Sequence, residues 1–120
     1  MTVFTPAPQK PAITADLLDR LDVRVGTITA VHDVPESRKL VRLSVDFGDH
    51  TRTIIVGMKT ERRDPSAVQG MQALFVVNLE PKRMMGHESQ GMLFDIGYAD
   101  GLRPVLAVPE QPVPDGARVG

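Results

Sequence analysis

The chain has 120 residues, of which 42% are hydrophobic and 24% charged, and its formal net charge is −1. This composition is ordinary for one folded domain, and no apolar run approaches the ~20 residues of a membrane span, so we expect no membrane insertion. Without cysteines or a charged-then-apolar leader, the sequence predicts a cytoplasmic protein that has neither disulfides nor thiolate metal sites.

The N-terminal region predicts a tail, a short helix and a long strand. Residues 1–13 are proline-rich and aperiodic, which is typical of a flexible tail. Residues 14–21 predict a short helix, because Thr14 can cap it and its leucines share one side. From Asp22 apolar and polar residues alternate, and the alternation changes phase after Gly26. A glycine at a phase change indicates a bulge or sharp bend in the first strand.

The rest of the chain predicts four more strands and a second helix. The strands are expected at residues 40–47, 51–58, 71–79 and 91–99, with a final extended piece at 102–109. Asp64 and Pro65 predict the start of a brief helix that Gly70 ends. Five strands with a short helix between the third and fourth are the layout of an all-β OB-fold, a Greek-key barrel that often binds nucleic acids. We expect this domain to span residues 14–120.

Three segments raise questions about what surrounds the barrel. Residues 71–79 are apolar on both faces, so we expect a helix or a second subunit to cover the outer one. The proline-rich residues 108–120 are expected to wrap the surface or to cross to a partner. The connection after residue 79 is about ten residues long, whereas an ordinary hairpin needs two to five.

The sequence offers no recognisable catalytic or cofactor-binding motif. His32, His50 and His87 share no metal-ligand spacing, and we interpret them as exposed loop residues. There is no HExxH, dinucleotide fingerprint or phosphate-binding loop, and no acid sits in a general acid/base motif. We therefore expect no enzyme activity, no metal and no cofactor.

The charge is unevenly distributed along the chain. Residues 38–83 contain nine Lys and Arg against five acids, and the remainder contains five against ten. The middle of the chain therefore carries a balance of +4 and the flanks −5. One positive surface on an acidic protein is compatible with this split, as is a simple scatter of charges.

Three quoted stretches resemble a known family. "DVRVGTITAVHDVPESRKLVRLSVDFG", "IIVGM" and "NLEPKRMMGHESQGMLF" are similar to the free-standing tRNA-binding domain that also occurs in some methionyl-tRNA synthetases, the phenylalanyl-tRNA synthetase β chain and cytokine-like synthetase cofactors. The short length, the ending "PVPDGARVG" and "DIGYADG" resemble the CsaA family, bacterial secretion-associated chaperones that also resemble tRNA binders. The resemblance covers about residues 14–120.

This resemblance implies a homodimeric OB-fold that recognises the outside corner of tRNA by shape and backbone contacts. The matching RNA-binding residues are Arg38, Lys39, Arg42, Lys82, Arg83, Ser89, Gln90 and Met92. Two alternatives stay open, since Met92 begins a strand that can place it in the core and Gln90 can be a solvated loop residue. Only four Phe and one Tyr are present, which disfavours a base-stacking platform and favours recognition of a folded RNA.

A peptide-binding chaperone that assists protein export is the alternative function. Its partners would be unfolded or exported polypeptides. Methionine adapts to many partners, so a methionine-lined groove would suit unfolded segments. The candidates for such a groove are Met58, Met71, Met84, Met85 and Met92.

Overall fold

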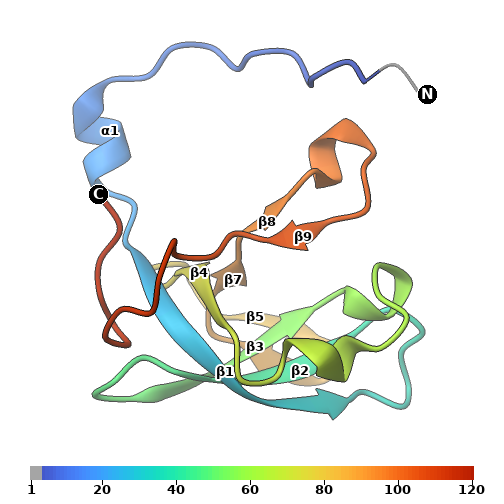
Figure 1. Cartoon of the computed structure of the whole chain (residues 1–120). Helices are drawn as coiled ribbons and strands as arrows, with labels where there is room; N and C mark the ends of the chain where they lie inside the picture. Colours follow the sequence, from blue (N-terminus) through green and yellow to red (C-terminus); the bar gives the residue numbers. More distant parts are fainter. Residues whose placement is uncertain (1–3) are drawn as a thin grey trace.

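The computed structural model describes residues 4–120, so residues 1–3 of the predicted tail lie outside the described part (Figure 1). Residues 4–13 are exposed and form neither helix nor strand. Helix α1 (Ala15–Asp19) falls inside the predicted range, and the Thr14 hydroxyl accepts a hydrogen bond from the Leu17 N–H at 3.2 Å. The predicted cap is therefore confirmed. No residue of α1 is buried.

A five-stranded antiparallel sheet forms the body of the molecule. Its strands are β1 (Val23–Asp33), β2 (Val41–Asp46), β3 (Thr51–Val56), β4 (Gln72–Val76) and β7 (Met92–Leu93), in the order β3-β2-β1-β4-β7. The sheet curls into a nearly closed barrel (Figure 1), because the segment before β7 also bonds to β3 through the Gln90 N–H and the Thr53 carbonyl, 2.8 Å apart. The predicted all-β, OB-like barrel is confirmed.

Strand β1 serves two sides of the barrel, as its phase change suggests. Its first half pairs with β4 and its second half with β2, and the pairing register shifts between Ile28 and Ala30. The irregularity therefore lies after Gly26, not at it. Gly26 is required for space instead, since a Cβ there would lie 2.6 Å from Val45 Cγ1 and 2.8 Å from Phe47 Cε1.

Two 3₁₀ turns close one end of the barrel. They are η1 (Met58–Thr60), which follows a third strand that ends at Val56 rather than at residue 58, and η2 (Pro65–Val68). The predicted helix after Asp64 is thus a 3₁₀ turn, and the Asp64 carboxylate caps it by accepting the Ser66 N–H at 3.1 Å. Met58 and Val68 pack into the core beside Phe47 and Phe75, whose rings meet edge to face with centroids 5.5 Å apart.

The region after β4 is more regular than the sequence predicts. The long connection contains a hairpin of β5 (Lys82–Met84) and β6 (His87–Ser89). The predicted strand at 91–99 is divided into β7, β8 (Asp95–Ile96) and the 3₁₀ turn η3 (Tyr98–Asp100), and β8 pairs with β9 (Val105–Leu106) in a separate ladder.

The C-terminal segment wraps the surface of its own chain. The Val25 N–H donates to the Ala117 carbonyl at 2.9 Å, and the Val119 N–H donates to the Val23 carbonyl at 2.8 Å. This segment and β9 follow the outer side of β1 and β4, where the Leu74 N–H donates to the Ala107 carbonyl. On the outer face of residues 71–79, the Gln72 side chain donates to the Val113 carbonyl at 2.6 Å and accepts the Val113 N–H at 3.1 Å, so the chain's own C-terminal part packs there. No helix within residues 4–120 is long and apolar enough to cross a membrane.

Candidate nucleic-acid interface

A row of cross-strand neighbours crosses five strands on the outer face of the barrel. Arg42 of β2 lies opposite His32 of β1 on one side and Ile55 of β3 on the other. The Ile55 N–H donates to the Ser89 hydroxyl at 3.0 Å, and Ser89 of β6 lies opposite Lys82 of β5. We call these five residues the cross-strand row. The row brings Arg42 and Lys82, 40 positions apart in the sequence, onto one continuous surface.

The loop between β1 and β2 (residues 34–40) presents two cations from a fixed backbone. The Lys59 ammonium donates to the carbonyls of Val34 and Ser37, at 2.9 and 2.7 Å. The Ser37 hydroxyl accepts the Lys39 N–H at 3.1 Å. Because the backbone is held from both sides, the exposed side chains of Arg38 and Lys39 are carried by a preformed turn.

The β5–β6 hairpin presents the second pair of cations. Its two-residue turn is Met85-Gly86, with φ of 51° and 80°, the positive values that a type I′ turn needs at both central positions. Lys82 and Arg83 are exposed on β5, and Arg83 also donates to the Gly86 carbonyl at 3.0 Å. Arg83 lies opposite Glu88, so one acid accompanies the pair.

Ser89 and Gln90 join the hairpin to the barrel. Ser89 is only 4% exposed, and its hydroxyl accepts the Ile55 N–H and donates to the Gly91 carbonyl at 3.1 Å. The Gln90 side-chain oxygen accepts the Thr53 N–H at 2.9 Å. Both side chains are thus already partnered, and Gln90 is half-buried rather than a solvated loop residue. Contact of either one with RNA stays a prediction.

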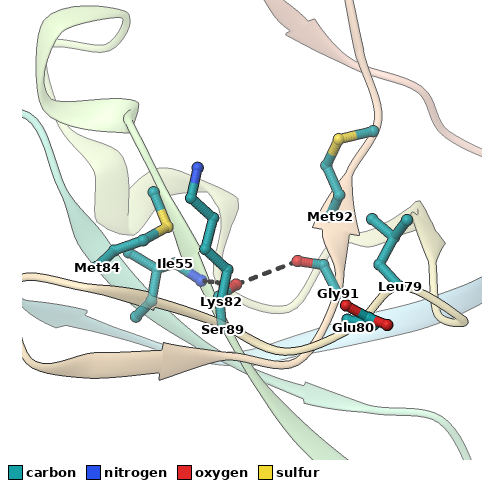
Figure 2. Close-up of a pocket in the computed structure, with 8 residues that line it drawn as sticks. All are labelled: Ile55, Leu79, Glu80, Lys82, Met84, Ser89, Gly91 and Met92. Carbon is teal, nitrogen blue, oxygen red and sulfur yellow. Dashed lines mark hydrogen bonds between the residues drawn. The ribbon is translucent and has the colours of Figure 1, made fainter.

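A groove of about 580 Å³ lies beside the cross-strand row. It is lined by Ile55, Leu79, Glu80, Lys82, Met84, Ser89, Gly91 and Met92. In Figure 2 Met84 and Met92 stand on opposite sides of the groove, the Lys82 side chain rises between them, and Ser89 lies at its floor. Met92 is 46% exposed, so it borders the groove and does not belong to the core.

A polar contact connects the hairpin to the β1–β2 loop. The Nε2 atom of His87 lies 2.9 Å from Oε1 of Glu36. A hydrogen bond from its own backbone and the one from His87 hold the pKa of the Glu36 carboxyl below its ordinary value. Two loops distant in the sequence therefore form one rim around the cross-strand row.

The structure places Arg42 and Lys82 in the cross-strand row, and Arg38 and Lys39 on the loop beside it. Arg83 alternates with Lys82 along β5 and lies opposite Glu88, so its side chain points to the other side of the hairpin.

Two other cations of residues 38–83 have structural roles: Lys59 fixes the β1–β2 loop, and the guanidinium of Arg52 donates to the Val77 and Gln90 carbonyls, at 2.5 and 3.1 Å. Sequence reasoning missed Ile55 and His32, because only the strand register shows that they adjoin Arg42. It also missed His87, which only the fold brings to Glu36.

The interpretation of the three histidines as exposed loop residues is wrong for two of them. His32 lies in β1 and His87 in β6, and both are half-buried. Only His50 occupies a turn, next to β3. In the part of the chain that the structure describes, no group of three or more His, Asp or Glu side chains is arranged to hold a metal ion.

Known proteins are similar to this chain in sequence and in fold. Residues 23–118 match the family model described as "Putative tRNA binding domain". The methionine–tRNA ligase of Thermotoga maritima is 38% identical over 117 residues, which are 98% of this chain and 18% of that protein, and the ligase of Thermococcus kodakarensis is 38% identical over 89% of this chain and 14% of its own. The chain therefore spans less than a fifth of these relatives.

Two solved structures extend the comparison. The MetRS-related protein of Pyrococcus horikoshii has a TM-score of 0.85 and 33% identity, with 92% of this chain and 100% of that one covered. The chaperone CsaA of Bacillus anthracis has a TM-score of 0.77 and 27% identity, with the same coverage of 92% and 100%. Because the family model matches four fifths of its residues, the chain belongs to the family of tRNA-binding domains.

Proposed function

We propose that the chain binds folded tRNA on the face of the cross-strand row and recognises it by shape and backbone contacts. The observation that carries this proposal is the placement of the cations. Arg38 and Lys39 lie on the first loop, Arg42 on the second strand, and Lys82 and Arg83 on the connection before the last barrel strand. OB-folds use this same strand face and these two loops to bind oligonucleotides. The function belongs to the cytoplasm and requires no catalytic residue.

The aromatic residues support backbone recognition over base stacking. Phe47 and Phe75 are buried in the core, and Phe94 is half-buried beside β4, where its N–H donates to the Leu74 carbonyl. Tyr98 is exposed but belongs to η3, outside the cross-strand row. Phe4 is exposed in the N-terminal segment. The proposed face therefore presents cations and methionines, and its aromatic rings are the half-buried imidazoles of His32 and His87 rather than exposed Phe or Tyr rings. Phosphate contacts by Lys and Arg suit such a surface.

The decisive experiment is a titration of labelled tRNA, followed by fluorescence anisotropy at several salt concentrations. Lys82→Ala, alone and with Arg83→Ala, should weaken binding and make the slope of log K against log salt shallower by about 0.7–0.9 for each phosphate that the variant no longer neutralises. Lys10→Ala is the matched control, because Lys10 is an exposed cation in the N-terminal segment. Equal affinity of wild type and the Lys82/Arg83 variant would refute the proposed face.

We also infer that two copies of the chain associate through α1. This helix has five residues and none is buried, yet Leu17 and Leu18 expose 47% and 60% of their surface. Isolated helices of this length are unstable in water, so α1 needs a packing partner. A second copy offers the same apolar helix, which suits a two-fold symmetric contact. Such a dimer is the assembly that the family resemblance implies.

Peptide binding is a second candidate, favoured by the apolar lining of the groove. Ile55, Leu79, Met84 and Met92 supply that lining, and one structural neighbour bears the name of a chaperone. The predicted five-methionine groove is wrong in its membership: Met58 is a core residue with 1% exposure, and Met71 borders a different hollow beside Pro109. This function would be favoured if the chain bound a denatured polypeptide with an affinity that does not change with salt concentration and did not bind tRNA.

A further inference from the structure

Three arginines converge outside the cross-strand row. Arg62 and Arg63 follow η1, whereas Arg103 comes from the segment between η3 and β9. Together with Thr60 and Glu61 they line an open pocket of about 460 Å³. The three arginines are separated by up to 41 positions in the sequence, so the fold, not local sequence, gathers them.

These guanidinium groups are not engaged by the protein's own carboxylates. The ion pairs found within residues 4–120 use Arg20, Arg24, Lys59, Arg118 and two histidines as their cations. Arg62, Arg63 and Arg103 are in none of them. Three arginines against Glu61 leave a formal charge of +2 among the lining residues. Arginines that share a pocket without partners repel one another, and an anion with several oxygens relieves that repulsion while it accepts paired hydrogen bonds.

The carboxylate of Glu61 does not fill this role. Burial raises its pKa, and the nearby charge of Asp95 raises it further, while Arg62 acts in the opposite direction. Glu61 also forms no ion pair with the three arginines within residues 4–120. The residues that line the pocket therefore carry more positive than negative charge, while Asp64 lines an adjoining hollow and Asp95 lies near Glu61.

The pocket adjoins the proposed RNA-binding face at the end formed by the β1–β2 loop. The Lys59 N–H of η1 donates to the Lys39 carbonyl at 3.0 Å, and the Lys59 ammonium donates to the Ser37 carbonyl at 2.7 Å. Arg62 follows directly, since its N–H donates to the Met58 carbonyl at 3.0 Å. Figure 1 shows the turns after β3 beside the β1–β2 loop. A nucleic-acid backbone that contacts Lys39 is therefore close to the pocket.

We propose that the Arg62–Arg63–Arg103 pocket is a second phosphate-binding site, which holds backbone phosphate of the same RNA that lies on the cross-strand row. This proposal rests on the proposed function and extends its footprint beyond the residues that the family motif indicates. The lining of this pocket contains no aromatic side chain that would bind a base, which favours recognition of phosphate oxygens. Tyr98 lines the neighbouring hollow, not this one.

The test adds one double variant and one single control to the tRNA titration. Arg63→Gln with Arg103→Gln should raise Kd several-fold and make the salt slope shallower by about 0.7–0.9 for each phosphate left without its arginine. Lys10→Gln, which removes one distant exposed cation, should change neither quantity. Circular dichroism and thermal melting of each variant establish that it is folded. If the double variant does not fold, the tRNA affinity of the single Arg63→Gln variant tests the proposal instead.

The outcomes separate this inference from the proposed function. If the Lys82/Arg83 variant binds tRNA weakly while the Arg63/Arg103 variant binds with wild-type Kd and salt slope, the function stands and the second site is overturned. If both variants bind like wild type, both proposals fail. A parallel calorimetric titration with inorganic phosphate tests whether the pocket is a site for a small anion. If the Arg63→Gln/Arg103→Gln variant loses phosphate binding but keeps wild-type tRNA affinity, the assignment to RNA is also overturned.

Discussion

The imidazole Nε2 of His87 lies 2.9 Å from Oε1 of Glu36, although 51 positions separate these residues in the chain. The contact ties the tip of the β5–β6 hairpin to the β1–β2 loop. These two segments carry four of the five cations predicted to bind RNA. This exposed polar contact therefore helps to set the spacing between the two sets of cations, together with the bonds of Ser89 and Gln90 that join the hairpin to β3.

The hairpin attachment should weaken in acid. The pKa of the Glu36 carboxyl is lowered from 4.5, first by its own backbone hydrogen bond and then by His87. A group whose pKa is lowered in the folded state stabilises that state above its unfolded-state pKa, and the contribution is lost as the pH falls through the folded-state pKa. We therefore expect protection of the His87–Ser89 amides from hydrogen exchange to hold at pH 6 and to fall as the pH is lowered below about 4.5. In Glu36→Gln the protection should already be reduced at pH 6, and equal protection in both proteins would contradict the role of this contact.

Ser89→Ala should destabilise the fold, whatever its effect on RNA. The change removes the acceptor of the buried Ile55 N–H, and an unsatisfied buried donor costs about 1–3 kcal/mol. The free energy of unfolding, measured in urea, should fall by that amount. Ser66→Ala is the control, because the Ser66 hydroxyl is exposed and its loss should change stability by less than ~0.5 kcal/mol. Wild-type stability of Ser89→Ala would show that the hydroxyl does not support barrel closure.

Gly26→Ala should destabilise the barrel through overpacking. The added methyl group would lie within 3 Å of Val45 and of the Phe47 ring, and extra atoms in a packed core cost about 1–3 kcal/mol. Gly57→Ala is a matched control, since a Cβ at Gly57 meets nothing within 4 Å and its φ of −86° is ordinary for alanine. Thermal melting should separate the two variants, and equal melting temperatures would contradict the packing argument.

Leu17→Ser together with Leu18→Ser should produce a monomer. Both side chains are exposed and belong to a helix that has no buried residue, so the change removes apolar contact from the inferred dimer without touching the core. Size-exclusion chromatography with light scattering reports the mass directly. Val108→Ser, at another exposed apolar position, should stay dimeric. A monomeric wild type would end the dimer inference.

Much of the fold follows from local rules of the sequence. The alternation of apolar residues predicted β1 and β2, and short apolar runs predicted β3 and β4. The side chains of Thr14 and Asp64 marked the starts of α1 and η2, because capping depends on neighbouring backbone N–H groups alone. The change of phase in the apolar alternation after Gly26 indicated that the first strand serves two sides of the barrel. Its irregularity lies after Ile28, since the glycine serves the packing of Phe47 instead.

The β5–β6 hairpin and the structural role of Ser89 could not be predicted from the sequence, for physical reasons. Residues 82–89 do not alternate, and their turn places Met85 at a positive φ of 51°, which is uncommon for a residue with a side chain. Burial of Ser89 depends on β3, more than 30 positions away. The basic residues of the candidate site were predicted through the family resemblance, whereas Arg103 carried no signal, because only the fold brings it to Arg62 and Arg63.

The C-terminal segment that pairs with β1 has a consequence for solubility. The backbone groups of Val23 and Val25 would otherwise form an open sheet edge, which can recruit strands from neighbouring molecules. Residues 116–119 occupy that edge, and the approach to it contains Pro112 and Pro114, which have no N–H to offer to an added strand. The segment therefore blocks the edge of β1, so that a strand of another molecule cannot pair with it.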